Sequence, residues 1–298
     1  MNDIDLHVHS NASDGTCSPS QVVELAKKAK LAAIALTDHD TVNGVGQALE
    51  AARQNGLRVI PGIEVSSIYE GTEIHILGLF VEKDDPDFLK ALERFQAIRD
   101  ERNQEMLERF EKAGIHLTKD MLTGSNPQTV ITRAHVARAL VRSGYASSME
   151  QAFKKYLTYG GAYCPPKKAP DPLTVTETLR ANGAFVSLAH PFQYKLGDER
   201  LGHLAESMKS WGMEGIEVYH SSHNSLETKK LLELSQKLEL FPTGGSDFHG
   251  SNKPGIAIGV GRGNLRIPLS LLENIEKGRK KPPVFSRNPD CASNQIRV

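Results

Sequence analysis

The chain has little cysteine, a single tryptophan and no excess of charge of either sign. Its three cysteines (Cys17, Cys164 and Cys291) stand far apart among 298 residues, which excludes a disulfide scaffold and a cysteine-based zinc site. Lys and Arg total 36 and so do Asp and Glu, so the formal net charge is zero. Because there is no overall basic field to attract nucleic acid or an anionic membrane, any nucleic acid would have to be bound locally.

Long hydrophobic runs are also missing. No stretch approaches the roughly 20 apolar residues that a membrane span requires. The first ten residues, MNDIDLHVHS, contain acidic residues where a signal peptide would carry a basic and then an apolar region. We therefore expect a cytoplasmic protein with no membrane association and no obligate protein partner.

Short apolar, β-branched runs recur along the chain and alternate with helical patterns. Helices are expected at about 18–30, 43–55, 171–183, 225–237 and 268–279, and the first of them opens with the capping sequence Ser18-Pro19-Ser20-Gln21. This alternation predicts an α/β protein with βα units around a mostly parallel sheet or barrel. The runs expected to be strands are Ile4–Leu6, Ala32–Thr37, Arg58–Glu64, Ile74–Val81, Phe185–Ala189, Gly215–Tyr219, Leu240–Thr243 and Ile256–Val260.

The segment from 86 to 170 breaks this rhythm, because it contains helical patterns at 87–113, 133–143 and 148–157 and no convincing strand. We expect it to be a helical insertion, or cap, between barrel segments 1–85 and 171–283. Residues 284–298 are polar with little periodicity, and we expect them to form an irregular tail.

Histidine is the residue type that stands out, with 11 copies. His7 and His9 end the first predicted strand at positions i and i+2, so both imidazoles point to the same side. Asp14 follows in a loop. Further His, Asp and Glu residues lie near the ends of predicted strands, with His75 as a partial exception because it falls early in its run. These residues are His39, Glu64, His75, His190, Asp247 and His249.

In β/α barrels the carboxyl ends of the strands form the active-site face. Each of these motifs alone is weak, since a single histidine after a strand is usually satisfied by hydrogen bonds. Their joint placement at one edge predicts a metal site, because buried imidazoles and carboxylates need partners and a bound metal ion can satisfy several of them at once.

The pattern resembles the PHP (polymerase and histidinol phosphatase) family. Its signature regions correspond to His7-Val8-His9, Thr37-Asp38-His39-Asp40, the segment at His190, and Ser246-Asp247-Phe248-His249, and the segments at Glu64 and His75 match as well. The resemblance covers about residues 3–85 and 172–263. It implies a distorted (β/α)7 TIM-like barrel that holds two or three divalent metal ions.

The resemblance also implies how nine ligands divide among three metals. The first would be bound by His7, His9, Glu64 and Asp247, the second by the bridging Glu64 with His75 and His190, and the third by Asp14, His39 and His249. Mixed imidazole and carboxylate ligands suit Mn, Fe or Zn better than Mg or Ca. The family resemblance favours Mn²⁺, with Fe²⁺ or Zn²⁺ as alternatives.

Charge points to an anionic substrate. Three dications and three carboxylates would leave a local charge of about +3. A phosphate monoester suits such a site, and we expect it to be attacked by a metal-bridging hydroxide held by Glu64 and Asp247. No nucleophile from the protein is then required.

Candidate substrate residues lie outside the ligand set. Arg133 and His135 open a predicted helix and are expected to hold a phosphate. His223 is expected to bind phosphate or to act as a general acid, with His220 in support. These residues resemble the nucleotide subgroup of the family, which contains 3′,5′-nucleoside bisphosphate phosphatase and RNase AM. That resemblance implies hydrolysis of a substrate such as pAp to AMP and phosphate.

Several alternatives stay open. The same chemistry would serve a 5′-to-3′ exonuclease on short RNA or a histidinol phosphate phosphatase. A bridged hydroxide could also attack an amide or a lactone, and a metal-binding or polymerase-associated module would not be an enzyme at all. The lysines that could form a basic track for RNA, or merely a solvated surface, are Lys154, Lys155, Lys167 and Lys168.

Overall fold

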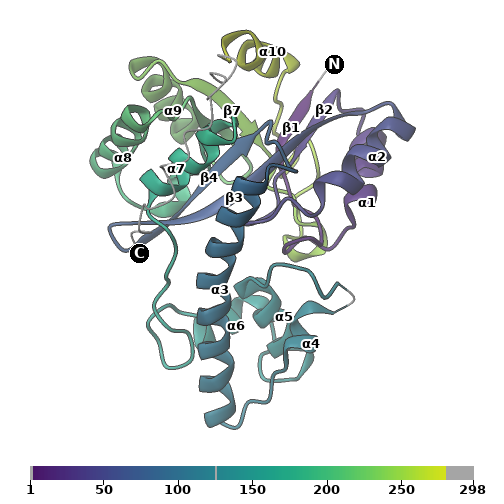
Figure 1. Cartoon of the computed structure of the whole chain (residues 1–298), viewed down its shortest axis with the longest axis vertical. Coiled ribbons are helices and arrows are strands. Elements are labelled where there is room, and N and C mark those ends of the chain that lie inside the picture. The colour runs from purple at the N-terminus through teal and green to yellow at the C-terminus, as the bar shows by residue number, and fades with distance from the viewer. Residues whose placement is uncertain (1–2, 125, 280–298) are drawn as a thin grey trace.

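Seven strands form one sheet in which each strand pairs with its neighbours along the chain. The computed structural model describes residues 3–124 and 126–279. Phe248, just after the last strand, forms a parallel bridge with Val8, so the sheet curves into a nearly closed barrel (Figure 1). This confirms the predicted α/β barrel. The strands are β1 (Ile4–Val8), β2 (Ala33–Leu36), β3 (Arg58–Tyr69), β4 (Thr72–Leu79), β5 (Phe185–Leu188), β6 (Gly215–His220) and β7 (Phe241–Gly245).

The strand β4 runs antiparallel to both of its neighbours, whereas the other pairs are parallel. No helix separates it from β3, in contrast to the expected βα alternation. Glu70 and Gly71 join the two strands with φ values of 47° and 76°, a pair that suits a tight hairpin turn. Because β4 is reversed, its first residues lie beside the last residues of its neighbours, and Ile76 is in register with Leu188 at the end of β5.

The prediction of a strand at Ile256–Val260 is wrong. These residues form turns, with only an isolated bridge between Ala257 and Gly261. Gly259 and Gly261 have positive φ values of 77° and 57°, which extended strands do not accommodate. The backbone N–H of Gly259 instead donates to the buried Asp5 carboxylate at 2.7 Å.

Helices cover the outside of the barrel, and the sequence patterns predicted most of them. The first begins with a capping box in which Ser18 and Gln21 each bond the other's backbone N–H, as its sequence predicts. The helix α8 carries a stripe of buried apolar residues but was not expected. The covering helices are α1 (Pro19–Lys28), α2 (Val45–Asn55), α7 (Pro172–Ala181), α8 (Asp198–Trp211), α9 (Ser225–Lys237) and α10 (Leu269–Gly278).

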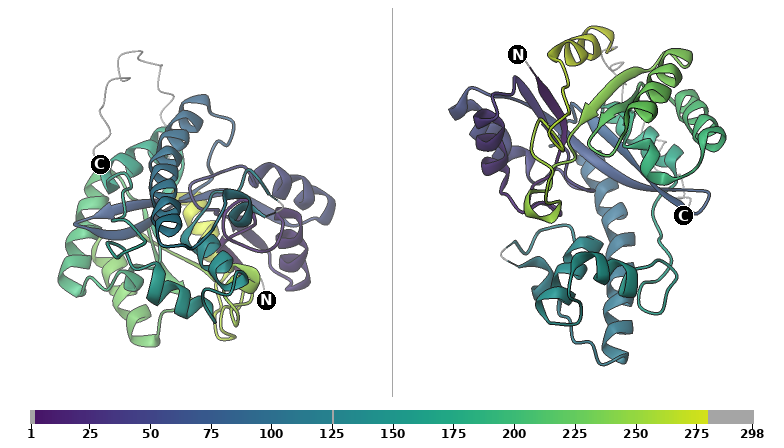
Figure 2. Two further views of the ribbon diagram at one scale, coloured as in Figure 1. Left: turned by 90° about the horizontal axis from the view of Figure 1, so that it is seen from below. Right: turned by 180° about the vertical axis from the view of Figure 1, so that it is seen from behind.

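The chain between β4 and α7 forms four helices that lie together beyond one end of the barrel (Figures 1 and 2). They are α3 (Pro86–Lys112), α4 (Lys119–Thr123), α5 (Arg133–Arg142) and α6 (Met149–Tyr156). The long helix α3 belongs to two cores. Phe88 and Phe95 pack in the barrel cluster, whereas Met106 and Phe110 pack with α5 and α6. The helix α3 therefore fixes the four-helix unit against the barrel edge.

Within the described ranges, none of the helices combines the length and apolarity that crossing a membrane would need. The predicted irregular tail, 284–298, and the last residues of the second barrel segment lie outside the described residues.

Candidate metal centre

The histidines and carboxylates predicted as metal ligands converge at the barrel edge that faces the four-helix unit. They come from β1, β3 and β4 and from the segments that follow β1, β2, β5 and β7. The structure brings all nine together in four overlapping groups, in each of which one ligand atom per residue lies within 4.8 Å of the others. The groups are His9, Asp14, His39 and His249; His7, His220 and Asp247; His7, Glu64 and His190; and His39, Glu64 and His75.

The Glu64 carboxylate lies at the middle of this arrangement and is buried. Its Oε1 atom lies 2.9 Å from His75 Nδ1 and 2.8 Å from His190 Nε2. The reversed direction of β4 explains why His75 reaches it, although this histidine falls early in its strand. The imidazoles with a nitrogen 3.2 Å from Oε2 are those of His7, His9 and His39.

Two aspartates complete the arrangement on either side of Glu64. Asp14 Oδ1 lies 3.1 Å from His249 Nε2, and Asp14 Oδ2 lies 3.8 Å from His39 Nε2. Asp247 Oδ1 lies 3.4 Å from His249 Nδ1 and 3.5 Å from His9 Nε2. Both carboxylates therefore face several imidazoles at once, as shared metal ligands do.

His220 joins a ligand group that the family resemblance did not assign to it. Its Nε2 atom lies 3.4 Å from Asp247 Oδ2 and is buried. His220 is the last residue of β6, so it shares the strand-end position of the other ligands. That position is the signal by which sequence reasoning could have ranked it among the ligands rather than as support.

Many of these polar atoms are buried without a hydrogen-bond partner. They include both ring nitrogens of His9, Nε2 of His7, Nδ1 of His39, Oε2 of Glu64 and Oδ1 of Asp14. Buried polar atoms in native proteins almost always have a partner, since leaving them unpaired costs free energy. Convergent imidazole nitrogens and carboxylate oxygens would be satisfied together by divalent cations, so the residues fit multiple bound metals.

Ionisation favours the same conclusion. Burial would raise the pKa of Glu64 and Asp247, but the surrounding charges outweigh it and hold both pKa values well below their usual range. Burial lowers the pKa of His190 to about 4. These are the ionised carboxylates and neutral imidazole that metals bind. Although burial would lower the pKa of His9, Asp247 and Glu64 raise it to about 9, so the negative charge that attracts a proton there would also attract a cation.

A buried glutamate behind the ligands was missed by sequence reasoning. Glu217 lies on β6, and its Oε1 atom is 3.0 Å from Nδ1 of His7. Its Oε2 atom accepts a hydrogen bond from the backbone N–H of His190 at 2.7 Å. Such a carboxylate fixes the tautomer and orientation of a metal-binding histidine. The available signal was a charged residue in the middle of the apolar strand Gly-Ile-Glu-Val-Tyr-His.

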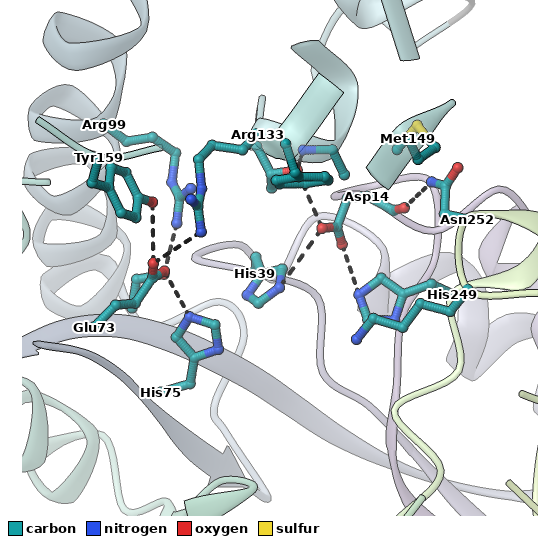
Figure 3. A pocket seen from close by; sticks show the side chains of 15 residues that line it. Asp14, His39, Glu73, His75, Arg99, Arg133, Met149, Tyr159, His249 and Asn252 are labelled. Carbon is teal, nitrogen blue, oxygen red and sulfur yellow. Dashed lines mark hydrogen bonds and ion pairs between the residues drawn. The ribbon is translucent and has the colours of Figure 1, made fainter. Parts of the chain in front are cut away.

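A pocket of about 320 Å³ opens between the metal centre and the four-helix unit (Figure 3). One wall consists of barrel residues that include Asp14, His39, His75 and His249. The opposite wall comes from the four-helix unit and the segment that follows α6. The residues of that wall include Thr132, Arg133, Met149, Phe153 and Tyr159. A molecule in this pocket would touch both the ligand groups and an arginine.

Arg133 is held in this pocket by several partners. Its Cζ atom lies 3.8 Å from the centre of the Tyr159 ring, and one guanidinium nitrogen donates to the carbonyl of Leu157 at 3.1 Å. Another lies 3.5 Å from Glu73, which also accepts a hydrogen bond from the Tyr159 hydroxyl at 3.0 Å. Glu73 further pairs with Lys167. Because these contacts already orient the guanidinium group of Arg133, little conformational entropy is lost when Arg133 binds an anion.

Arg133 and His135 face different cavities, although only Ala134 separates them on α5. The backbone N–H of Thr132 donates to Nδ1 of His135 at 3.1 Å, so this histidine is part of the helix cap. His135 is buried and lines a second cavity behind the Asp14 loop. Burial lowers its pKa to about 4.

His223 lies behind His220, with their ring centres 5.2 Å apart. Its Nδ1 atom is 3.0 Å from the carbonyl of Val218, and it is not among the residues that line the pocket. A neutral ring that donates from Nδ1 presents Nε2 as an acceptor, and burial lowers the pKa of His223. These contacts favour a role for His223 in supporting His220 over a role as a proton donor.

The four candidate lysines do not form one continuous track. Lys154, Lys155 and Lys168 are exposed, whereas the side chain of Lys167 is covered and pairs with Glu73. Burial lowers the pKa of Lys167 to about 8.

Comparison with known proteins agrees with this site. The family model of the PHP domain matches residues 5–163. The chain is 35% identical over 262 residues to the 3′,5′-nucleoside bisphosphate phosphatase of Chromobacterium violaceum, with 87% of this chain and 91% of that protein covered. It is 36% identical over 245 residues to the 5′-3′ exoribonuclease of Haemophilus influenzae, with 82% and 89% covered.

A solved structure from Bifidobacterium adolescentis, assigned to the metal-dependent phosphoesterases, superposes with a TM-score of 0.82 at 29% identity and covers 92% of this chain and 95% of that one. The family resemblance drawn from the histidine motifs is therefore confirmed. The chain belongs to the PHP family and is a metal-dependent phosphoesterase.

Proposed function

We propose that the enzyme removes the 3′-phosphate of a nucleoside 3′,5′-bisphosphate, converting a substrate such as pAp to AMP and inorganic phosphate. The observation that carries this proposal is the pocket in which the ligand groups face Arg133 across a partly apolar wall. Phosphate requires positive charge, and a nucleobase requires a flat apolar surface. Met149, Phe153 and Tyr159 supply that surface beside Arg133.

We propose that the nine residues from β1 to β7 bind two or three divalent metals, with His220 as a further ligand candidate. Mn²⁺ is our preferred metal, because imidazole and carboxylate donors suit it and the neighbouring transition metals. When bound, these ions supply positive charge to the phosphoryl oxygens and lower the pKa of water at the reaction centre. Glu64 belongs to two of the ligand groups and Asp247 to one, so Glu64 would be the carboxylate that two ions share.

The chain's own residues would orient the substrate. Arg133 keeps N–H groups free for a phosphate after its contacts with Leu157 and Glu73, since a guanidinium has five donors. Arg99 also lines the pocket, and its pairing with Asp40 and Ser66 fixes it on the same wall. These two cations would hold the phosphate that is not hydrolysed and leave the other at the ligand groups.

Hydrolysis of short RNA from the 5′ end is the second candidate. The relative from Haemophilus influenzae carries the name 5′-3′ exoribonuclease at 36% identity, so both substrates occur among similar proteins. In both reactions the bond between phosphorus and the 3′-oxygen of the first nucleotide breaks. The two candidates therefore share one orientation of that nucleotide in the pocket.

A substrate panel with added Mn²⁺ tests the proposal. It comprises adenosine 3′,5′-bisphosphate, AMP, a 5′-phosphorylated oligoribonucleotide and histidinol phosphate. We expect the bisphosphate to have the highest kcat/KM and to yield AMP, and we expect a chelator to abolish the activity. Preferential hydrolysis of histidinol phosphate, or turnover that survives complete metal removal, would contradict the proposal. The Asp247→Asn variant is the inactive control.

A further inference from the structure

A second cavity, of about 360 Å³, lies on the far side of the Asp14 loop from the pocket at the metal centre. Its walls come from the loop that begins at Asn11, from α4 and residues that follow it, from one face of α5 and from Ser251 and Asn252. Asn252 lines both cavities, and its side-chain amide donates to the backbone carbonyl of Asp14 at 2.5 Å. The two cavities therefore adjoin beside a predicted metal ligand.

This second cavity carries two arginines, Arg138 and Arg142. They are four residues apart on α5, so they share one face of the helix. Among the described residues, no acidic side chain lines the cavity. Burial and the charge of Arg142 lower the pKa of the half-buried Arg138, and the Asp14 carboxylate only partly offsets them. Two neighbouring cations in a cavity that no acidic side chain lines are the arrangement that an anion would stabilise.

The other lining groups are also suited to a phosphate. The Thr16 hydroxyl accepts a hydrogen bond from the backbone N–H of Ser251 at 2.9 Å, which ties two walls of the cavity together. Asn11 and Ser13 add further polar groups, and the cavity lining is mostly polar. A nucleobase would find little apolar surface here, unlike in the pocket beside Tyr159.

We propose that the cavity formed by Arg138 and Arg142 binds a backbone phosphate of an oligonucleotide, on the 3′ side of the bond that is hydrolysed. The inference rests on the proposed function only in placing the first nucleotide in the pocket of Arg133. In a bisphosphate the chain stops at the phosphate that is hydrolysed. In an oligonucleotide the same phosphate is a diester, and the chain continues toward the adjoining cavity.

The reaction balances in the same way for both substrates. Water adds to phosphorus, the bond to the 3′-oxygen breaks, and that oxygen takes a proton and leaves as the 3′-hydroxyl of a nucleoside 5′-monophosphate. The phosphate remains on the shortened chain as its new 5′-phosphate. The arginine cavity therefore contributes to hydrolysis of chains and contributes nothing to hydrolysis of a bisphosphate.

The test compares Arg138→Gln/Arg142→Gln with Lys90→Gln/Lys112→Gln, which removes the same charge from exposed positions on α3. With Mn²⁺ bound, kcat/KM is measured for a 5′-phosphorylated pentaribonucleotide and for adenosine 3′,5′-bisphosphate. We expect the arginine variant to lose about tenfold or more on the pentamer and to stay within twofold on the bisphosphate. The slope of log kcat/KM against log salt concentration for the pentamer should become shallower by about 0.7, the amount expected for one phosphate contact on a single strand.

An equal loss on both substrates, or no loss on the pentamer, would overturn the inference. The single variant Arg142→Gln, at an exposed position, guards against misfolding of the double variant and should show a smaller loss in the same direction. Binding of a fluorescein-labelled phosphorothioate pentamer, followed by anisotropy, separates this inference from the proposed function. If neither substrate is hydrolysed, the proposed function fails, while weaker pentamer binding by the arginine variant alone would still support the cavity.

Discussion

The Nδ1 atom of His7 lies 3.0 Å from Oε1 of Glu217, and the two residues are 210 positions apart in the chain. The other oxygen of Glu217 accepts the backbone N–H of His190. One buried carboxylate therefore orients a predicted metal ligand on β1 and fixes the segment after β5 that carries another predicted ligand. The barrel closure that places β6 behind β1 creates this relationship.

Glu217→Gln should weaken metal binding. The glutamine amide carries no negative charge, and only one of its two polar atoms can accept a hydrogen bond, so it cannot replace the carboxylate at both His7 and His190. Loss of such a supporting partner typically costs about 10- to 100-fold in metal affinity. Calorimetric titration of the metal-free protein with Mn²⁺ measures the change. Glu233→Gln, at an exposed position on α9, is the control and should bind as the wild type does. Equal affinities for all three proteins would contradict the role assigned to Glu217.

Gly245→Ala should disturb the centre through packing alone. A Cβ atom at Gly245 would lie 2.2 Å from Cβ of His7, and the neighbouring contacts are with His7 backbone, so β1 and β7 would have to move apart. We expect a loss of about 1–3 kcal/mol in the free energy of unfolding, together with weaker Mn²⁺ binding. Gly46→Ala is the matched control, because a Cβ there meets nothing within 4 Å, and it should stabilise the helix by up to about 1 kcal/mol. Urea denaturation separates the two variants, and a Gly245→Ala protein as stable as the control would contradict the packing argument.

Arg133→Met should weaken substrate binding while leaving the metals in place. The methionine keeps much of the contact with Tyr159 but removes the charge. A hydrogen bond to a charged group contributes about 1.5–3 kcal/mol, so KM for the bisphosphate should rise about tenfold or more. Metal content by mass spectrometry should equal that of the wild type. Arg53→Met, on the exposed surface of α2, is the control. An unchanged KM would remove Arg133 from the substrate site.

His135 should make the protein less stable in mild acid. Its folded pKa is about 4, lowered chiefly by burial from an ordinary value of 6.5. Between pH 6.5 and pH 4 this histidine is therefore protonated in the unfolded chain but neutral in the folded protein. The free energy of unfolding accordingly falls as the pH drops from 6.5 toward 4.

We expect His135→Asn, whose side-chain oxygen can still accept from Thr132, to lose less stability than the wild type between pH 7 and pH 5. The difference should be on the order of 1–2 kcal/mol, since one pKa unit corresponds to about 1.4 kcal/mol. Urea denaturation at both pH values measures it. His116→Asn removes an exposed histidine and should retain the wild-type pH dependence. A His135→Asn protein that behaves like this control would refute the prediction.

Local patterns predicted much of the fold. The period of apolar residues and the capping residues located seven strands and most helices, because these signals depend on neighbours in the chain. The glycine-rich turn at 256–260 was mistaken for a strand, since its apolar residues resemble a short buried run. The helix α8 was overlooked even though Leu201, Leu204 and Met208 give it an apolar stripe.

The metal-binding character of the site could be predicted from the positions of His, Asp and Glu residues relative to the predicted strands. His7-Val8-His9 and the Asp247 segment follow predicted strands, and parallel strands bring such residues to one edge. His75 was the one candidate that falls early in its predicted strand, but in the structure it lies at the same barrel edge as the others. The hairpin at Glu70 and Gly71 reverses β4, so the beginning of this strand meets the ends of the others.

The sequence by itself determined the barrel, the metal-binding chemistry and the family, because each depends on residue types at intervals set by strand and helix geometry. Only the tertiary structure decided that Glu217 supports His7, that His220 lies among the predicted ligands, and that Arg133 and His135 face different cavities. These relationships join residues from separate strands or from opposite sides of one helix. They depend on how the barrel closes and how α5 packs against it, which no local pattern specifies.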